Sequence, residues 1–368
     1  MRKIKRILVV GEFNSNPKIY TYATSFYKAF KKLGYETFQF NCKQNCLKFF
    51  GNTHYYLPGK LQKFNNYLIN RFLIKKIKTI NPDLIFFLKA ENIYSKTIKK
   101  IKNNKNIIVN FYPDNPFVTW NGNSNLNVLN SLPFYDCFLI WSQMLKQPLI
   151  SAGCKSVYYF PFVYDAEVFE SFDPSTSSGQ ALDKKDDRRG NGDVCFVGTW
   201  DKEREEWLEK LMHSFSIHPE EQTLFASRRI NLIIYGNDWH ENLSSDSVLR
   251  RHLKGKAVYS DDLLKVFKSS KIVLNFIRKQ NMTSHNMRTI EVPATKTFLL
   301  TQRTKEQADL LFSEGENIEC FSDIDELIEK INFYLTNEDA RNKLVDASFE
   351  KAQEYEIKKQ LQKFLEIL

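Results

Sequence analysis

Arg288 and Glu291 carry complementary chemistry and stand three residues apart. An arginine offers a planar fork of donors that matches phosphate oxygens, and a carboxylate can accept hydrogen bonds from two neighbouring hydroxyl groups, as on a ribose. Residues three apart on a helix share a face, so both side chains could bind one molecule. The pair favours a nucleotide site, and the alternative is a salt bridge on a solvated helix surface.

The segments around this pair predict how it is presented. Residues 270–276 and 297–300 are short apolar runs with β-branched residues, the pattern of buried strands. Residues 278–285 form a polar stretch, and a short helix follows that ends near Pro293. We expect one strand–loop–helix–strand crossover, with the pair near the start of its helix. Backbone N–H groups favour anions there, and open α/β sheets bind ligands there.

Other candidates for the same site also follow predicted strands. Gly198 and Gly236 each come directly after a short apolar run, where a glycine lets the backbone approach a ligand closely. Arg204 begins the next helix, where a phosphate would be well held. Lys202 competes with it, and ordinary helix-surface charge is the alternative for both. The remaining donor-site candidates flank the polar loop: Asn275, His285 and Asn286.

A second place with chemistry follows the predicted strand 106–111. In the segment 112–117, two prolines hold the backbone extended around Asp114. We take Asp114 as the candidate contact for a sugar or an acceptor, and as a candidate general base. The alternative is a turn-forming aspartate that caps a loop.

Length and composition bound the class of protein. A chain of 368 residues is long enough for two ordinary domains, and a hydrophobic fraction of 42% is normal for a globular protein. No stretch approaches the roughly 20 apolar residues that span a bilayer, and residues 1–11 fit a basic tail and a first strand better than a signal peptide. The cysteines and histidines show no metal-ligand spacing, so we expect no metal, no disulfide framework and a cytoplasmic location.

Charge is uneven along the chain. Residues 1–170 hold 24 Lys and Arg against 9 Asp and Glu, a net charge of +15, whereas the remainder has a net charge of −5. A basic first domain could face an anionic acceptor or make peripheral contact with an acidic membrane surface. A lysine-rich composition bias is the alternative. No signature of a nucleic-acid-binding module is present, so we expect no nucleic-acid partner.

Residues 61–80 predict a basic amphipathic helix in this first domain. Its inner side is expected to carry the apolar residues Leu68, Ile69, Phe72, Leu73 and Ile77. Such a helix could touch a membrane, and packing on its own sheet is the alternative.

The predicted elements divide the chain into two domains. Strands and helices alternate through 1–170 and again through 194–352. Residues 171–193 are small, polar and charged, which predicts a flexible linker or a disordered insertion. The final segment, 353–368, predicts a helix that returns to the first domain.

The C-terminal half resembles a known family. Residues 286–294 (NMRTIEVPA), 298–301 (FLLT) and 306–312 (EQADLLF) are similar to the C-terminal signature of the spore maturation protein CgeB family. The resemblance continues through 315–321 (GENIECF) and 325–327, and residues 196–200 (FVGTW) with Arg204 resemble the start of the same domain. That family consists of glycosyltransferase-like proteins.

The resemblance implies the GT-B fold, in which two Rossmann-like α/β domains face a cleft and a C-terminal helix crosses back to the first domain. It implies a glycosyltransferase that moves a sugar from a nucleotide sugar, a UDP- or GDP-sugar, to a hydroxyl group. The acceptor would be a glycan, a lipid-linked molecule or a protein, and no metal or other cofactor is expected. A catalytically degenerate binding protein and a nucleotide-sugar epimerase are the alternatives.

The resemblance also implies roles for single residues. In related retaining enzymes of glycosyltransferase family 4, a glutamate heading the last donor-binding helix holds the ribose, and Glu291 matches that position. Those enzymes carry a second glutamate eight residues earlier, where this chain has Thr283. The segment around Asp114 is similar to the Asp-x-Pro segment of the CgeB family. The residues expected to neutralise the diphosphate or to orient phosphate and sugar are Arg204, Arg288, Asn286 and His285.

Overall fold

The computed structural model describes residues 4–14, 20–47, 57–119, 123–169, 192–215, 230–281 and 283–368. The chain forms two compact units. Unit 1 comprises Met1–Phe162, Lys279–Ser284 and Glu356–Leu368, and unit 2 comprises Val163–Arg278 and His285–Tyr355. Most of the expected linker, 171–193, lies outside the described residues. The sequence did not indicate that residues 279–284 belong to unit 1, although the residues on both sides of them belong to unit 2.

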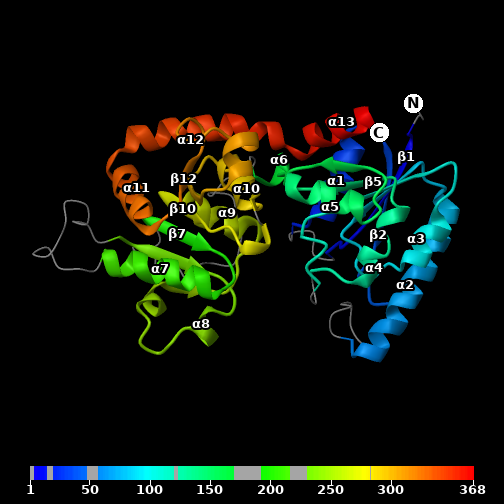
Figure 1. The fold of residues 1–368 in the computed structure, drawn as a ribbon, viewed down its shortest axis with the longest axis horizontal. Helices are drawn as coiled ribbons and strands as arrows, with labels where there is room; N and C mark the ends of the chain where they lie inside the picture. Colours follow the sequence, from blue (N-terminus) through cyan, green and yellow to red (C-terminus); the bar gives the residue numbers. More distant parts are fainter. Residues whose placement is uncertain are drawn as a thin grey trace, which may run out of the picture. The chain divides into compact units, whose positions relative to one another are not determined.

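Unit 1 is built on a parallel six-stranded sheet with the order β2-β1-β3-β4-β5-β6 (Figure 1). The central strands are apolar runs buried on both faces, as a parallel sheet covered by helices requires. The strands are β1 (Arg6–Gly11), β2 (Glu36–Asn41), β3 (Leu84–Leu88), β4 (Ile107–Tyr112), β5 (Cys137–Ile140) and β6 (Val157–Tyr159).

The helices of unit 1 connect these strands, and one of them comes from the chain's end. They are α1 (Tyr22–Lys32), α2 (Gly59–Ile80), α3 (Ser95–Ile101), α4 (Leu126–Leu129) and α5 (Lys146–Ser151), with 3-10 turns η3 (Leu132–Phe134) and η4 (Gln143–Leu145). The C-terminal helix α13 (Ile357–Ile367), red in Figure 1, packs on α1, and its Phe364 contacts the ring of Tyr158. The last helix therefore belongs to unit 1, as expected.

Helix α2 buries a different set of side chains from the one expected. Its inner face holds Ile69, Leu73 and Ile77, but Phe72 is 51% exposed. The expectation for Phe72 is wrong. Because each helical residue turns the chain by about 100°, a residue next to the centre of the buried face can already point to solvent.

Unit 2 repeats the architecture with the order β12-β11-β10-β7-β8-β9, again all parallel. Its strands are β7 (Val194–Val197), β8 (Leu232–Tyr235), β9 (Leu253–Gly255), β10 (Ile272–Asn275), β11 (Leu299–Gln302) and β12 (Glu319–Phe321). The sequence did not predict β9, which is too short to show a period. The expected crossover from β10 to β11 is confirmed.

The helices of unit 2 connect its strands, and two long helices follow its last strand. They are α6 (Ala166–Phe169), α7 (Lys202–Ser214), α8 (Trp239–Asn242), α9 (Ser260–Lys268), α10 (Arg288–Ala294), α11 (Ile324–Thr336) and α12 (Glu338–Ala352). Shorter turns are η7 (Val248–His252), η10 (Gln353–Tyr355) and the π-helical turn η9 (Gln307–Leu311), while η8 (Lys279–Asn281) lies in unit 1. Among the described residues, no helix combines the length and the hydropathy needed to cross a bilayer.

Each sheet has one point at which the chain changes direction across it. In unit 1 it lies between β1 and β3, because β2 pairs with the opposite edge of β1. In unit 2 it lies between β7 and β10, and its strand order is that of dinucleotide-binding domains. Ligands of open α/β sheets bind outside the carboxyl ends of the strands at these switch points.

Candidate active site

Three arginines, the arginine cluster, gather at the switch point of the unit 2 sheet. Arg204 lies in the first turn of α7, Arg278 follows the end of β10, and Arg288 begins α10. Because β7 and β10 are neighbours, the segments after them meet. Asp201 Oδ2 lies 3.3 Å from Arg278 Nε and 3.4 Å from Arg204 Nε.

Two of the three nitrogens of the Arg204 guanidinium group have carbonyl acceptors. Its Nη1 donates to the carbonyl oxygen of Thr199 at 2.8 Å, and its Nη2 donates to the carbonyl oxygen of Phe276 at 3.5 Å. Its Nε is buried and makes no hydrogen bond to any described residue, since the Asp201 oxygen lies outside hydrogen-bonding geometry. Burial and the positive charges of Arg278 and Arg288 lower the pKa of Arg204 to about 10, despite Asp201. An anionic ligand would stabilise such a group.

Arg288 and Glu291 form the pair that their spacing predicts. Arg288 Nη1 donates to Glu291 Oε2, and Glu291 is 2% exposed, so the pair is not a salt bridge on a solvated surface. The guanidinium carbon of Arg288 lies 5.4 Å from the centroid of the Phe267 ring. Arg288 Nε is buried and has no hydrogen-bond partner in the described part of the chain. The ribose contact of Glu291 stays a prediction.

The start of α10 does not offer the backbone donors that the sequence suggested. The helix has seven residues, and its first amides are already bonded. Arg288 N–H donates to Asn286 Oδ1 at 3.0 Å, and the amides of Ile290 and Glu291 donate to the carbonyl oxygen of Met287. The expectation of anion binding by these amides is therefore wrong, and the groups here that could bind an anion are guanidinium side chains.

A buried polar network fixes α10 against the sheet. Asn275 Nδ2 donates to Thr301 Oγ1 at 3.0 Å, and Asn275 Oδ1 accepts from Asn286 Nδ2 at 2.8 Å. Thr289 Oγ1 donates to Gln307 Oε1 at 2.7 Å, which ties α10 to the π-helical turn. The amides of Asn275 and Asn286 are used by the protein itself. In this geometry they hold α10 and the backbone of Arg288 in place, and a contact of either with a donor stays a prediction.

The two glycines are needed because the chain approaches itself closely. A Cβ at Gly236 would lie 1.9 Å from the carbonyl oxygen of Gly198, and that oxygen accepts from Trp239 Nε1 at 2.8 Å. A Cβ at Gly198 would lie 3.2 Å from Arg204 Nη1. The absence of side chains lets the ends of β7 and β8 meet directly beside Arg204.

His285 and Lys202 differ from the arginine cluster in charge and in burial. His285 is fully buried, and burial lowers its pKa to about 3, so the imidazole is neutral. It adds no charge to the site. The side chain of Lys202 is 65% exposed and pairs with Glu205 at 2.8 Å. Of the two basic candidates near the start of α7, the geometry favours Arg204.

At the switch point of the unit 1 sheet lie five charged residues, the unit 1 charge cluster. They follow the ends of β1, β2, β3 and β4: Glu12, Lys43, Lys89, Glu91 and Asp114. Lys89 Nζ lies 2.7 Å from Asp114 Oδ2 and 3.0 Å from Glu91 Oε1. Burial alone would lower the pKa of Lys89, but the charges and hydrogen bonds of these two carboxylates outweigh it and raise the pKa. Asp114 is therefore held by a lysine.

The backbone beneath this cluster is strained. Lys89 and Ala90 have φ angles of 64° and 54°, in the left-handed region that residues with a Cβ rarely adopt. Strain of this kind costs of the order of 1–3 kcal/mol per residue and occurs where a site needs a particular geometry. The turn directs Lys89 towards Asp114.

Arg278 and Lys89 were not among the expected site residues. Lys89 directly follows the buried strand β3, as Gly198 follows β7, and Arg278 lies three residues beyond the end of β10. A position shortly after a predicted strand was the sequence signal that could have identified both residues. The partner of each depends on which strands are neighbours, which the sequence does not state.

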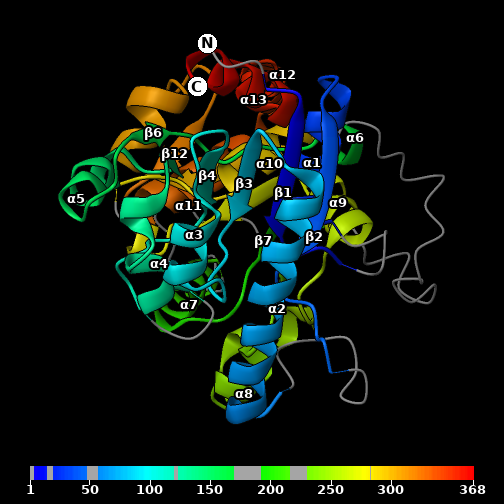
Figure 2. The same ribbon diagram turned by 90° about the vertical axis from the view of Figure 1, so that its right-hand side faces the viewer.

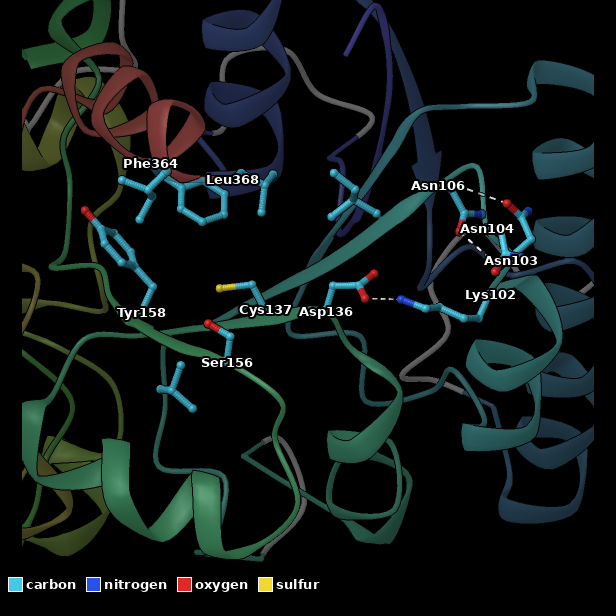
Figure 3. A pocket seen from close by; sticks show the side chains of 13 residues that line it. Lys102, Asn103, Asn104, Asn106, Asp136, Cys137, Ser156, Tyr158, Phe364 and Leu368 are labelled. Atoms are coloured by element: carbon cyan, nitrogen blue, oxygen red, sulfur yellow. Dashed lines mark hydrogen bonds and ion pairs between the residues drawn. The ribbon is translucent and has the colours of Figure 1, made fainter. Parts of the chain in front are cut away.

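A cavity of about 510 Å³ opens at the opposite, amino-terminal edge of the unit 1 sheet (Figure 3). Lys102 pairs with Asp136, whose Oδ2 also accepts from the Ile108 amide at 2.8 Å. Asn103 and Asn106 bond to the backbone of their own loop. Because ligands of open α/β sheets bind at the carboxyl ends of the strands, we place the candidate site at the switch points and not at this edge.

Within the described ranges, His, Cys, Asp and Glu side chains form no group of three or more that could hold a metal ion. The six cysteines are unpaired thiols, five of them buried. The positive charge near the site comes from arginines.

Comparison with known proteins identifies similar families and folds. Residues 204–366 match the model of a family described as glycosyl transferase-like, and this range contains the whole arginine cluster and Glu291. No curated protein matches the chain.

Solved structures are similar over nearly the whole chain. A sucrose-phosphate synthase from Thermosynechococcus elongatus has a TM-score of 0.64 at 13% identity, and the match covers 99% of this chain and 98% of that one. An α,α-trehalose 6-phosphate synthase from Burkholderia multivorans has a TM-score of 0.65 at 12% identity, with coverages of 99% and 98%. An E. coli structure described as trehalose-6-phosphate bound with UDP-2-fluoro glucose has a TM-score of 0.61 at 13% identity, with coverages of 99% and 98%. The chain has the GT-B fold.

Proposed function

We propose that the protein is a glycosyltransferase. It moves a sugar from a nucleoside diphosphate sugar to an acceptor hydroxyl group, with arginines in place of a metal ion at the diphosphate. The fold, the match of residues 204–366 and the resemblance of residues 286–294 to the CgeB family support this reading. One solved structure of the same fold is described as bound with a UDP-sugar, so we propose a UDP- or GDP-sugar as donor.

One observation carries the proposal. At the switch point of the unit 2 sheet, Arg204 and Arg288 each keep a buried Nε without an acceptor among the described residues, and Arg278 adds a third positive charge. A diphosphate supplies both negative charge and acceptor oxygens, and arginines bind it in a forked geometry. Glu291 orients Arg288 and is our candidate for the ribose hydroxyls.

The chemistry follows from this placement. In the reaction, the bond from the anomeric carbon to the diphosphate oxygen breaks, and a bond to the acceptor oxygen forms. Negative charge then grows on the leaving nucleoside diphosphate, and the arginine cluster stabilises it. The acceptor hydroxyl gives up a proton, for which Asp114 is our candidate base. Lys89 orients its carboxylate at 2.7 Å.

Unit 1 is our candidate acceptor domain. Its cluster holds two lysines and three carboxylates, so it suits a polyhydroxyl group better than a phosphate. We propose a glycan, a lipid-linked molecule or a protein as acceptor, and a cytoplasmic location. Contact with a membrane through the basic part of unit 1 belongs to the proposal.

Calorimetric titration with UDP, GDP and their sugars tests the donor site. Arg278→Ala removes the most exposed guanidinium of the cluster and should weaken nucleoside diphosphate binding about tenfold or more, the loss expected for one charged contact. Arg288→Ala should weaken it at least as much. Arg251→Ala removes an exposed arginine elsewhere in unit 2 and should leave Kd unchanged. Equal Kd values for all four proteins would refute the site.

A binding protein without turnover is the second candidate. The presence of Thr283 at the position of the family 4 glutamate favours it. Incubation with a labelled nucleotide sugar separates the two functions. Release of nucleoside diphosphate supports the enzyme, whereas tight donor binding without release, in the presence of candidate acceptors, supports the binding protein.

A further inference from the structure

Helix α2 carries aromatic and basic side chains on its outer face. Phe64, Tyr67 and Phe72 are 49%, 45% and 51% exposed. The rings of Phe64 and Tyr67 stack at 6.4 Å, and the guanidinium of Arg71 lies 5.8 Å from the Tyr67 ring. These residues recur at helical spacing over more than two turns, so they form one continuous stripe. Figure 2 shows α2 along the side of unit 1 that faces the viewer.

The opposite face already anchors the helix. Besides its apolar residues, it buries Asn65 and Asn70. Asn65 Oδ1 accepts from the Cys46 amide at 2.7 Å, and Asn70 Oδ1 accepts from the Tyr94 amide at 2.9 Å. The helix therefore does not need the outer aromatic residues for its own packing. Exposing three of them on one helix loses hydrophobic free energy that contact with a partner would recover.

The charged residues of α2 and of the neighbouring helix α3 are all basic. The 22 residues of α2 contain six Lys and Arg and no Asp or Glu. Helix α3, which packs against α2, adds Lys96, Lys99 and Lys100, all exposed, and has no acidic residue. A partner for this surface must therefore be negatively charged and must accept aromatic rings.

We propose that the outer face of α2 binds a bilayer surface that contains anionic phospholipids. The face is defined by Phe64, Tyr67, Arg71, Phe72, Lys75 and Lys78. From Phe64 to Lys78 it runs about 21 Å along one helix, at 1.5 Å per residue. Phenylalanine rings enter the boundary between headgroups and acyl chains, while lysine and arginine side chains reach the phosphates.

A nucleic acid offers the same charge but suits this surface less well. The phenylalanine rings lie on an outward helix face and not in a groove, whereas proteins that bind single strands stack bases inside a basic groove. The membrane surface uses both the charges and the apolar rings. This inference names the surface for the membrane contact that is part of the proposed function. Its test does not depend on glycosyl transfer, because no residue of the donor site takes part in it.

Vesicle co-sedimentation of the full chain tests the surface. Vesicles of phosphatidylcholine with phosphatidylglycerol should bind the protein, pure phosphatidylcholine should bind it far less, and high salt should release it. Lys75→Gln with Lys78→Gln should lower the partition coefficient about 25-fold, from roughly fivefold for each charge. Phe64→Ser with Phe72→Ser should lower it about tenfold through lost apolar burial.

Matched controls keep the test specific. Phe333→Ser removes an equally exposed phenylalanine from α11, and Lys358→Gln with Lys359→Gln removes two exposed lysines from α13. Both should bind vesicles like the wild type, and every variant should keep the wild-type Kd for nucleoside diphosphates. Equal binding to neutral and anionic vesicles, or equal losses in the controls, would overturn the proposal. Salt-sensitive binding to an oligonucleotide without vesicle binding would overturn it in favour of a nucleic acid.

Discussion

At the switch point of the unit 1 sheet two lysines face three carboxylates, whereas at that of the unit 2 sheet three arginines face two carboxylates. The two sheets share a parallel six-stranded architecture, and both sites lie outside the carboxyl ends of their strands. In unit 1 the charges pair with one another. In unit 2 two guanidinium groups keep a buried nitrogen without an acceptor in the described part of the chain.

This difference teaches how one architecture can serve two substrates. The topology sets where a ligand binds, since strand ends and switch points coincide in both units. The side chains after the strands set what charge the ligand has. A surplus of guanidinium groups suits a diphosphate, and a self-paired cluster suits a group with many hydroxyls.

Removing one cation from each site should give the largest difference between the two units. The difference is expected in the free energy of unfolding. Arg288→Ala leaves the carboxylate of Glu291, 2% exposed, without its partner and should cost about 3–5 kcal/mol. Lys89→Ala leaves Asp114 with a side chain 25% exposed, which solvent can reach, and Glu91 keeps Lys43 at 3.8 Å, so the loss should be about 1 kcal/mol. Urea unfolding measures both.

A double variant distinguishes the loss of the ion pair from the loss of side-chain packing in the urea experiment. Arg288→Met combined with Glu291→Met removes both charges and should recover most of the stability lost by Arg288→Ala. Equal losses for Arg288→Ala and Lys89→Ala would show that the two clusters do not differ in burial as the structure describes.

The polar network beneath Arg288 should give the next effect. Gln307→Leu removes a fully buried amide that accepts from Thr289 Oγ1 and donates to the carbonyl oxygen of Gln302 at 2.9 Å, so it should cost about 2 kcal/mol. It should also weaken nucleoside diphosphate binding, because α10 carries Arg288. Thermal unfolding and calorimetry measure the two effects.

The matched control for Gln307 is Asn65 in unit 1. Asn65→Leu removes an equally buried amide, which also donates to the carbonyl oxygen of Gln44 at 3.0 Å, and should cost a similar amount of stability. It should leave nucleoside diphosphate affinity unchanged. If both variants weaken binding equally, Gln307 acts through general stability and does not position Arg288.

Acid should destabilise unit 2 by the smallest of these effects. Hydrogen bonds and charge from Arg303, with a contribution from Lys330, lower the pKa of Glu326 to about 2 and hold that of Glu314 below its usual value. A folded-state pKa below the unfolded value stabilises the fold above the unfolded pKa, and this stability is lost as pH falls towards 2. The loss should be on the order of 1 kcal/mol, because the side chains are partly exposed.

Urea midpoints between pH 5 and pH 2 check this slope. In Arg303→Met the carboxylates lose their main partner, so the midpoint should start lower and fall less over the same range. A wild-type midpoint that stays constant through this range would contradict the assignment to Glu314 and Glu326. The window and the direction both follow from the lowered pKa values of the carboxyl groups.

The sequence by itself determined the local features of this protein. Short apolar runs alternate with helical periods, and this alternation predicted most strands and the parallel α/β architecture. The spacing of Arg288 and Glu291 predicted that they share a helix face, because the geometry of one helix turn is fixed, and left open whether they bind a ligand or each other. The glycines after β7 and β8 were predicted to let the backbone approach a ligand. In the structure the chain's own atoms come close to both, and the ligand contact stays a prediction.

The tertiary structure alone decided which residues meet. Arg278 joins Arg204 because β10 lies next to β7, and Lys89 meets Asp114 because β3 lies next to β4. Such pairings depend on the strand order of the whole sheet, which no local pattern contains. The same reason explains Phe72: a helix's own period defines a stripe, but its packing partners decide which edge of that stripe is buried.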